Sequence, residues 1–153
     1  MRLARSARRF GEADFLHVRA ADNAVASLEV ILRDFAEVVD LSAQPAPFAA
    51  LLRDSIAADR IGPVRVVGDA AGRAAPGSGA LDVADQSADL AVSLMSLHWA
   101  NDLPGALSQI RRALKPDGLF LGTLLGAGTL KEFRSVLTEA EMESRDGAQA
   151  RVS

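Results

Sequence analysis

The chain has 153 residues, 49% of them apolar, a net charge of −3 and no cysteine. This length and composition favour one domain with a substantial core, and the mild charge gives no reason to expect a nucleic-acid partner. The absence of cysteine excludes disulfides, thiolate zinc sites and cysteine nucleophiles, and two histidines are too few to indicate a metal site.

Two features of the sequence bear on where the protein is located: the length of its apolar runs and its basic start. No apolar run reaches the roughly 18–20 residues that a membrane span requires, so we expect a cytoplasmic protein without a membrane span. The start, MRLARSARRF, is basic and free of acids. It is interpreted either as a fragment of a targeting peptide or as a solvated arm.

The first half of the chain predicts a helix, a strand, a second helix and a second strand. Apolar spacing predicts a helix over 22–35, and residues 37–41 and 63–69 are β-branched strand candidates. Pro45 and Pro47 suit the start of the helix between the two strands. The buried face of the first helix is expected to hold Val25, Leu28, Ile31, Leu32 and Phe35. That of the second is expected to hold Phe48, Leu51, Leu52 and Ile56.

The second half continues the alternation after a Gly- and Ala-rich loop at 70–80. The apolar run 89–97 predicts a strand buried on both faces, and Asn101 or Asp102 is expected to cap the following helix. A turn at Asp117-Gly118 leads to a strand over 119–126. The buried stripe of the capped helix is predicted as Leu103, Leu107, Ile110 and Leu114. A last helix after residue 129 is expected to bury Leu130, Phe133, Val136 and Leu137.

Strands that alternate with helices predict βαβ units and a mainly parallel sheet, here with four clear strands. Open sheets of this kind bind ligands at the carboxyl ends of their strands. In this sequence those ends fall at 40–44, 68–72, 96–102 and 126–129.

The stretch SLMSLHWANDLPGALSQIRRALKPDGLF resembles the fourth and fifth strands of class I S-adenosylmethionine-dependent methyltransferases. It is most similar to two branches, the arginine-hydroxylase assembly factor of respiratory complex I and the biotin-pathway carrier-protein methyltransferase. The resemblance covers about 9–134. It implies an α/β, Rossmann-like methyltransferase fold, apparently truncated at its C-terminus, in a single domain over 1–153. That domain would comprise a helical segment at 1–36, the sheet and crossover helices at 37–126, and a C-terminal helix and tail at 127–153.

The resemblance also implies a site for S-adenosylmethionine. Asp40 matches the acid that ends the first strand in the family, and Asp69 matches the acid that holds the ribose hydroxyls. His98 and Trp99 match the loop that faces cofactor and acceptor. The residues expected to bind the cofactor are Asp40, Ser42, Gln44, Asp69, Leu94, His98 and Trp99.

Three departures from the family pattern keep a second interpretation open. The turn DLSAQPAPFA contains no glycine, and the acid expected to contact adenine falls on Gly77 or Ser78. The interval between Asp69 and Asp89 is too short for a complete extra strand and helix, so one sheet element is reduced or missing. The final two strands of the family are absent, which leaves an apolar edge that a second copy could cover.

The individual residues do not settle the chemistry. His98 is either a base or a hydrogen-bonded corner histidine, and Trp99 either stacks on a ligand or packs in the protein. His17 is interpreted as satisfied or exposed. No nucleophile–base–orienter set is evident. The sequence therefore predicts a methyltransferase acting on a protein or small-molecule acceptor, or a degenerate pseudoenzyme that serves as an assembly or interaction factor. In both cases we expect a homo-oligomer.

Overall fold

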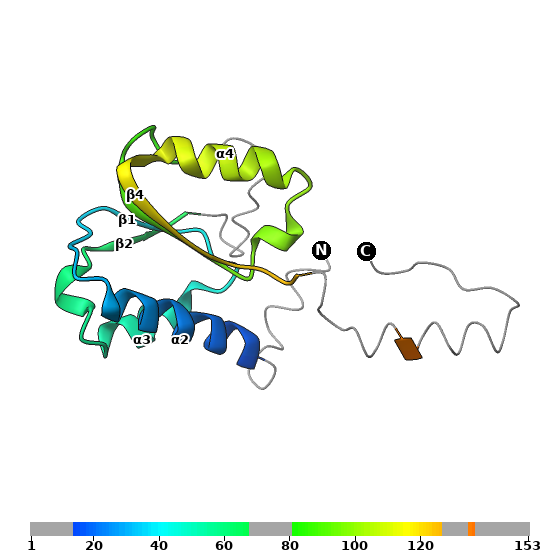
Figure 1. Ribbon diagram of the computed structural model, residues 1–153, viewed down its shortest axis with the longest axis horizontal. Coiled ribbons are helices and arrows are strands. Elements are labelled where there is room, and N and C mark those ends of the chain that lie inside the picture. The colour runs from blue at the N-terminus through cyan, green and yellow to red at the C-terminus, as the bar shows by residue number, and fades with distance from the viewer. Residues whose placement is uncertain (1–13, 68–80, 127–134, 137–153) are drawn as a thin grey trace, which may run out of the picture.

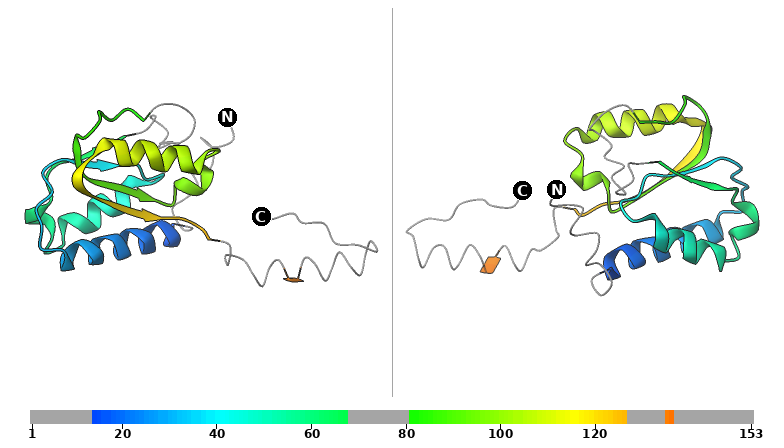
Figure 2. Two further views of the ribbon diagram at one scale, coloured as in Figure 1. Left: turned by 45° about the horizontal axis from the view of Figure 1, so that its top comes forward. Right: turned by 180° about the vertical axis from the view of Figure 1, so that it is seen from behind.

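The computed structural model describes residues 14–67, 81–126 and 135–136. Four parallel strands form one sheet in the order β2-β1-β3-β4. Helices lie on both faces of this sheet, as Figures 1 and 2 show: α2 and α3 cover one face and α4 covers the other. The elements are α2 (Phe15–Val30), β1 (Val38–Asp40), α3 (Pro45–Arg53), β2 (Val64–Val66), β3 (Ala88–Leu94), α4 (Leu103–Ala113) and β4 (Leu114–Thr123). The predicted α/β fold with a mainly parallel sheet is confirmed.

β3 is the central strand, and its alternating side chains serve two cores. Leu90 and Val92 face the core that α2 and α3 cover. Ala91, between them, faces the core under α4, because successive strand residues point to opposite faces. Ala88 also belongs to the core under α4, and the register with β4 is irregular between it and Leu90.

The first predicted helix was misplaced. α2 ends at Val30 rather than at residue 35, and Leu32 is 87% exposed. Phe35 is buried as predicted, but in extended chain that pairs with Ile61. A Cβ on Gly62 would lie 2.2 Å from the Ala36 oxygen, so the close approach there needs glycine. The buried face of α2 consists mainly of alanines: Ala20, Ala21, Ala24, Val25 and Leu28.

The predicted buried faces of the next two helices, α3 and α4, were wrong in part. α3 stops at Arg53, which leaves Ile56 75% exposed. Leu107 on α4 is 40% exposed, because α4 packs through Ala106, Ile110 and Ala113 instead. The cap of α4 is confirmed: the Gly105 N–H donates to Asp102 Oδ1 over 2.9 Å.

The strand boundaries also differ from the prediction. β3 ends at Leu94 rather than at residue 97, because Met95 adopts a left-handed φ of 55°. β4 begins at Leu114, and the predicted turn at Asp117 is a bulge within it. There the pairing with β3 jumps from Ala88↔Leu114 to Leu90↔Leu119.

The remaining predictions concern the segments around these elements. Between β2 and β3, the described residues 67 and 81–87 form no further strand. Of the predicted last helix only Ser135 and Val136 are described; both are helical, and Val136 is 60% exposed rather than buried. The other residues of that predicted helix lie outside the described residues. So do Gly77 and Ser78, where the adenine-contacting acid was expected. No helix in the described part of the chain has the length and apolar character to cross a membrane.

Candidate functional site

The sheet has a topological switch point between β1 and β3. From β1 the chain passes to β2 on one side, while β3 pairs with β1 on the other. Open α/β sheets bind ligands outside the carboxyl ends of the two strands that flank such a point. Asp40 ends β1 and Leu94 ends β3, so the site predicted from sequence lies here.

A network of buried hydrogen bonds joins these two strand ends, and we refer to Asp40, Ser42, Ser93 and Ser96 as the polar seam. The Leu94 N–H donates to Ser42 Oγ over 3.0 Å. The Ser96 hydroxyl donates to the Leu41 carbonyl over 2.9 Å and lies 2.7 Å from Ser93 Oγ. Each seam residue is at most 3% exposed. Because the hydrogen bonds cross from one loop to the other, the seam fixes the shape of the strand ends.

Asp40 is the charged member of the seam and is fully buried. Its Oδ1 accepts from the Ser42 N–H over 2.8 Å, and its Oδ2 has no hydrogen-bond partner among the described residues. Burial raises the pKa of the Asp40 carboxyl, and the hydrogen bonds from Ser42 only partly oppose this. From this position Asp40 holds the turn at Ser42.

The other predicted site residues differ in their access to solvent. Leu94 is buried, and its backbone rather than its side chain belongs to the seam. Gln44 and His98 are half-buried, and Trp99 is 69% exposed. Asp69 lies outside the described residues.

His98 lies in the short 3-10 helix Leu97–Trp99 that follows β3. Its Nδ1 is buried and has no hydrogen-bond partner in the described part of the chain, and its ring centroid is 5.1 Å from that of Trp99. Burial lowers the pKa of His98, and the nearby positive charge of His17 lowers it further. His98 is therefore mostly neutral at pH 7, in the form that can accept a proton.

His17 reaches this region from the first turn of α2. Its Nδ1 lies 3.0 Å from Asp14 Oδ1, and its side chain is 17% exposed. Asp14 occupies the N-cap position, but its side chain makes no cap hydrogen bond. The structure thus shows His17 as a paired side chain, as the sequence interpretation allowed, and places its charge near His98.

Sequence reasoning missed two members of the seam, Ser93 and Ser96. The available signal was their position, since they are the only hydroxyl residues in the otherwise apolar run DLAVSLMSL. Thr123 Oγ1, at the end of β4, is also buried without a hydrogen-bond partner among the described residues. No group of three or more His, Asp or Glu side chains in the described ranges could hold a metal ion.

Comparisons with known proteins agree with this geometry. Residues 38–122 match the family described as "Methyltransferase domain". A stretch of 65 residues, 42% of the chain and 20% of the relative, is 51% identical to "Arginine-hydroxylase NDUFAF5, mitochondrial" of Danio rerio. Another of 55 residues, 36% of the chain and 19% of the relative, is 47% identical to "Malonyl-[acyl-carrier protein] O-methyltransferase" of Methylovorus sp. (strain MP688). The matched stretches thus span about a fifth of these curated relatives.

Two solved structures show the same fold. One is the complex between the Haloferax volcanii Trm112 methyltransferase activator and a putative methyltransferase, with a TM-score of 0.59 and 24% identity; the match covers 77% of this chain and 57% of that one. The other is a SAM-dependent methyltransferase of Thermotoga maritima, with a TM-score of 0.55 and 18% identity, covering 90% and 67%. The sheet therefore has the Rossmann-like methyltransferase arrangement.

Proposed function

Because the chain belongs to the methyltransferase-domain family, we propose that it binds S-adenosylmethionine at the carboxyl ends of β1 and β3. It would transfer the methyl group to a protein or small-molecule acceptor. The observation that carries the proposal is the switch point between these strands, with an acid at the end of β1 and an accessible His98-Trp99 pair after β3. The proposed cofactor-binding residues are Asp40, Ser42, Gln44, Asp69, Leu94, His98 and Trp99.

The residues at the strand ends fit this cofactor. The seam leaves Asp40 Oδ2 unpaired within the described residues. Gln44 and His98 are half-buried and Trp99 is 69% exposed, so polar and aromatic groups are available to a nucleoside. The sulfonium cofactor, when bound, supplies an already activated methyl group, so the protein's task is to position the acceptor and exclude water.

A second candidate function is a cofactor-free assembly or interaction factor, and a specific observation favours it. Ser42 stands where family members often have glycine, and it is 2% exposed. Its hydroxyl oxygen accepts a hydrogen bond from the Leu94 N–H. A side chain at this position fills space that a glycine turn would leave to the methionine part of the cofactor. In this alternative the exposed Trp99 would contact a partner protein.

Location and assembly belong to the same proposal. We propose a cytoplasmic location, although the arginine-hydroxylase relatives are named mitochondrial. We also propose a homo-oligomer, because β4 is an edge strand of the described sheet and offers unpaired backbone groups to a second copy. Light scattering across a range of concentrations should give a mass above that of one chain; a single-chain mass at high concentration would contradict this part.

The chain contains one tryptophan, Trp99, so its fluorescence reports directly on the proposed site. Titration with S-adenosylhomocysteine should change the Trp99 emission and saturate. Ligand at 100 times Kd should stabilise the fold by about 2.7 kcal/mol, which raises Tm by several degrees. Trp99→Phe should lose the optical signal and, because Trp99 is a proposed binding residue, should also reduce the rise in Tm. No change in either signal at millimolar ligand would favour the assembly factor.

A further inference from the structure

His98 lies at the carboxyl edge of the sheet, and one of its ring nitrogens has no partner there. The side chain is half-buried, and Nδ1 is buried without a hydrogen-bond partner in the described part of the chain. A protonated imidazole donates from both nitrogens, so an unpaired Nδ1 leaves the charged form poorly stabilised. Because Nδ1 is on the buried side of the ring, Nε2 is the nitrogen left for a ligand. Buried polar groups without partners need an explanation, and a part in the chemistry is one.

The first turn of α2 brings a second histidine to the same edge. α2 leads into β1 at the amino edge of the sheet, so its first turn lies at the carboxyl edge, as the end of β4 does (Figure 1). There His17 Nδ1 lies 3.0 Å from Asp14 Oδ1, and the two side chains are only 17% and 28% exposed. A carboxylate beside one ring nitrogen fixes the orientation of an imidazole. Asp14 and His17 therefore form an ordered pair at this edge.

The charges at this edge favour the neutral form of His98. The described ionisable side chains there include Asp14 and His17 on α2, Asp40 at the end of β1 and Asp102 before α4. Asp102 is engaged as the cap of α4, and Asp40 holds the turn after β1. Burial lowers the pKa of His98, and the positive charge of His17 lowers it further. His98 can therefore accept a proton at pH 7.

Trp99 supplies an aromatic surface beside this base. Its side chain is 69% exposed, and its ring centroid is 5.1 Å from that of His98 at an interplanar angle of 43°. An exposed indole offers its face to another planar ring, because aromatic rings stack. A base next to a stacking surface suits a planar acceptor that gives up a proton, and a phenol has both properties. A phenol hydroxyl titrates near about 10, so its attack at neutral pH gains from a base, whereas a carboxylate acceptor has no proton to lose.

We propose that the methyl acceptor is a phenol stacked on Trp99, that His98 is its catalytic base, and that Asp14 and His17 are the positioning pair that holds His98 in its proton-accepting form. This inference rests on the proposed methyl transfer. The phenol oxygen bonds to the methyl carbon as the bond from that carbon to the cofactor sulfur breaks, and the electron pair of the broken bond stays on sulfur. The phenol proton moves to Nε2 of His98. The products are a methyl ether and a neutral thioether, and no further reactant is required.

Two probes that differ only in the acceptor group test the substrate class: p-cresol, a phenol, and p-toluate, a carboxylate. The full chain with S-adenosylmethionine should methylate p-cresol and not p-toluate, as measured by mass spectrometry. His98→Asn should lower the p-cresol rate by about 100-fold or more, whereas the exposed Ser108→Ala on α4 should leave it unchanged. Preference for p-toluate, or an undiminished rate in His98→Asn, would overturn the proposal. If neither probe reacts although S-adenosylhomocysteine binds, the phenol class alone is overturned; if S-adenosylhomocysteine does not bind, the proposed function fails as well.

The role of His17 can be tested without activity, because the chain has two histidines and their imidazole NMR signals can be assigned by substitution. His17→Gln removes a nearby positive charge and should raise the pKa of His98. Since His98 must be neutral to act, the rise of the p-cresol rate with pH should move to higher pH in this variant. Asp22→Asn changes an exposed charge on the same helix and is the control, with the pKa of His98 expected near that of wild type. An unchanged pKa of His98 in His17→Gln would overturn the positioning role.

Discussion

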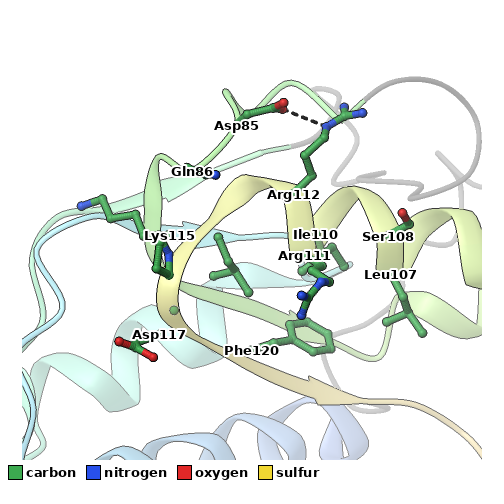
Figure 3. A pocket seen from close by; sticks show the side chains of 13 residues that line it. Asp85, Gln86, Leu107, Ser108, Ile110, Arg111, Arg112, Lys115, Asp117 and Phe120 are labelled. Atoms are coloured by element: carbon green, nitrogen blue, oxygen red, sulfur yellow. Dashed lines mark hydrogen bonds and ion pairs between the residues drawn. The ribbon is translucent and has the colours of Figure 1, made fainter.

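The polar seam lies at the carboxyl ends of the strands, whereas a cavity of about 830 Å³ between α4 and the first half of β4, the α4–β4 groove, lies at their other ends (Figure 3). Both contain hydrogen-bonding side chains. In the seam, three serines and Asp40 are at most 3% exposed, and their hydrogen bonds join two loops. In the groove, Arg112 and Asp85 form an ion pair with both side chains more than half exposed. A buried hydrogen bond cannot be replaced by water when one partner is lost, whereas an exposed one can. The seam should therefore tolerate far less change than the groove.

The largest effect is expected from Ser96→Ala. The substitution leaves the buried Leu41 carbonyl and Ser93 hydroxyl each without their Ser96 partner, which should lower the free energy of unfolding by about 2–3 kcal/mol. Chemical denaturation measures this directly. Ser108→Ala removes an exposed hydroxyl from the groove and is the matched control, with no more than about 0.5 kcal/mol expected. Equal losses in the two variants would remove the contrast between the regions.

Two substitutions of Asp40 distinguish the effect of its hydrogen bond on stability from the effect of its buried charge. Asp40→Ala removes the acceptor of the Ser42 N–H and should cost about 1–3 kcal/mol. Asp40→Asn keeps an acceptor oxygen and removes the buried charge. Because burial raises the folded pKa of Asp40, ionisation weakens the fold as pH rises through that pKa. Asp40→Asn should thus gain stability relative to wild type at neutral pH and lose that advantage in acid, as thermal melts across pH would show. A pH-independent difference would contradict the assigned cause.

Asp89 provides an intermediate case at the start of β3. Its Oδ2 accepts from the Glu37 N–H and from Lys115 Nζ, each over 3.0 Å. Although partial burial acts to raise the pKa of Asp89, these partners and the charge of Arg33 hold it below the usual value. A lowered folded pKa stabilises the fold above the unfolded pKa, and this is lost as pH falls through the folded pKa.

Asp89→Asn should therefore cost about 1 kcal/mol at neutral pH and nothing in acid below the folded pKa, measured by denaturation at both conditions. Lys115→Met should give a smaller loss with the same pH dependence, because the Glu37 N–H contact remains. A loss that persists undiminished in acid would show that packing, rather than charge, dominates at this position.

The smallest effect is expected from Arg112→Ala in the groove. Both members of its ion pair with Asp85 are exposed, at 59% and 64%, so solvent screens the interaction and the loss should be no more than about 0.5 kcal/mol. A double-mutant cycle with Asp85→Ala isolates the pair. A coupling energy as large as the Ser96→Ala effect would contradict the assignment of this pair as solvent-screened.

The order of elements was predictable from sequence because hydrophobic periodicity and the Pro and Gly positions encode it. The face of each helix was less predictable. Leu32 fits an apolar stripe but lies beyond the end of α2 at Val30. Leu107 fits one too, but α4 packs through Ala106, Ile110 and Ala113. The role of Ser96 in the seam was not predictable either. Its hydroxyl bonds to the Leu41 carbonyl, which is distant in sequence and comes close only in the folded chain.

The pairing pattern of the sheet also constrains how the chain assembles. β3, α4 and β4 are consecutive in sequence and form the longest stretch of pairing, whereas β1 has three residues and must meet β3 from across the whole β2 region. Closing the shorter loop costs less chain entropy, so we expect residues 88–123 to form the nucleus and β1 to dock afterwards. Amide hydrogen exchange should then protect Leu90 and Leu121 longest and β2 least, and the reverse order would refute it.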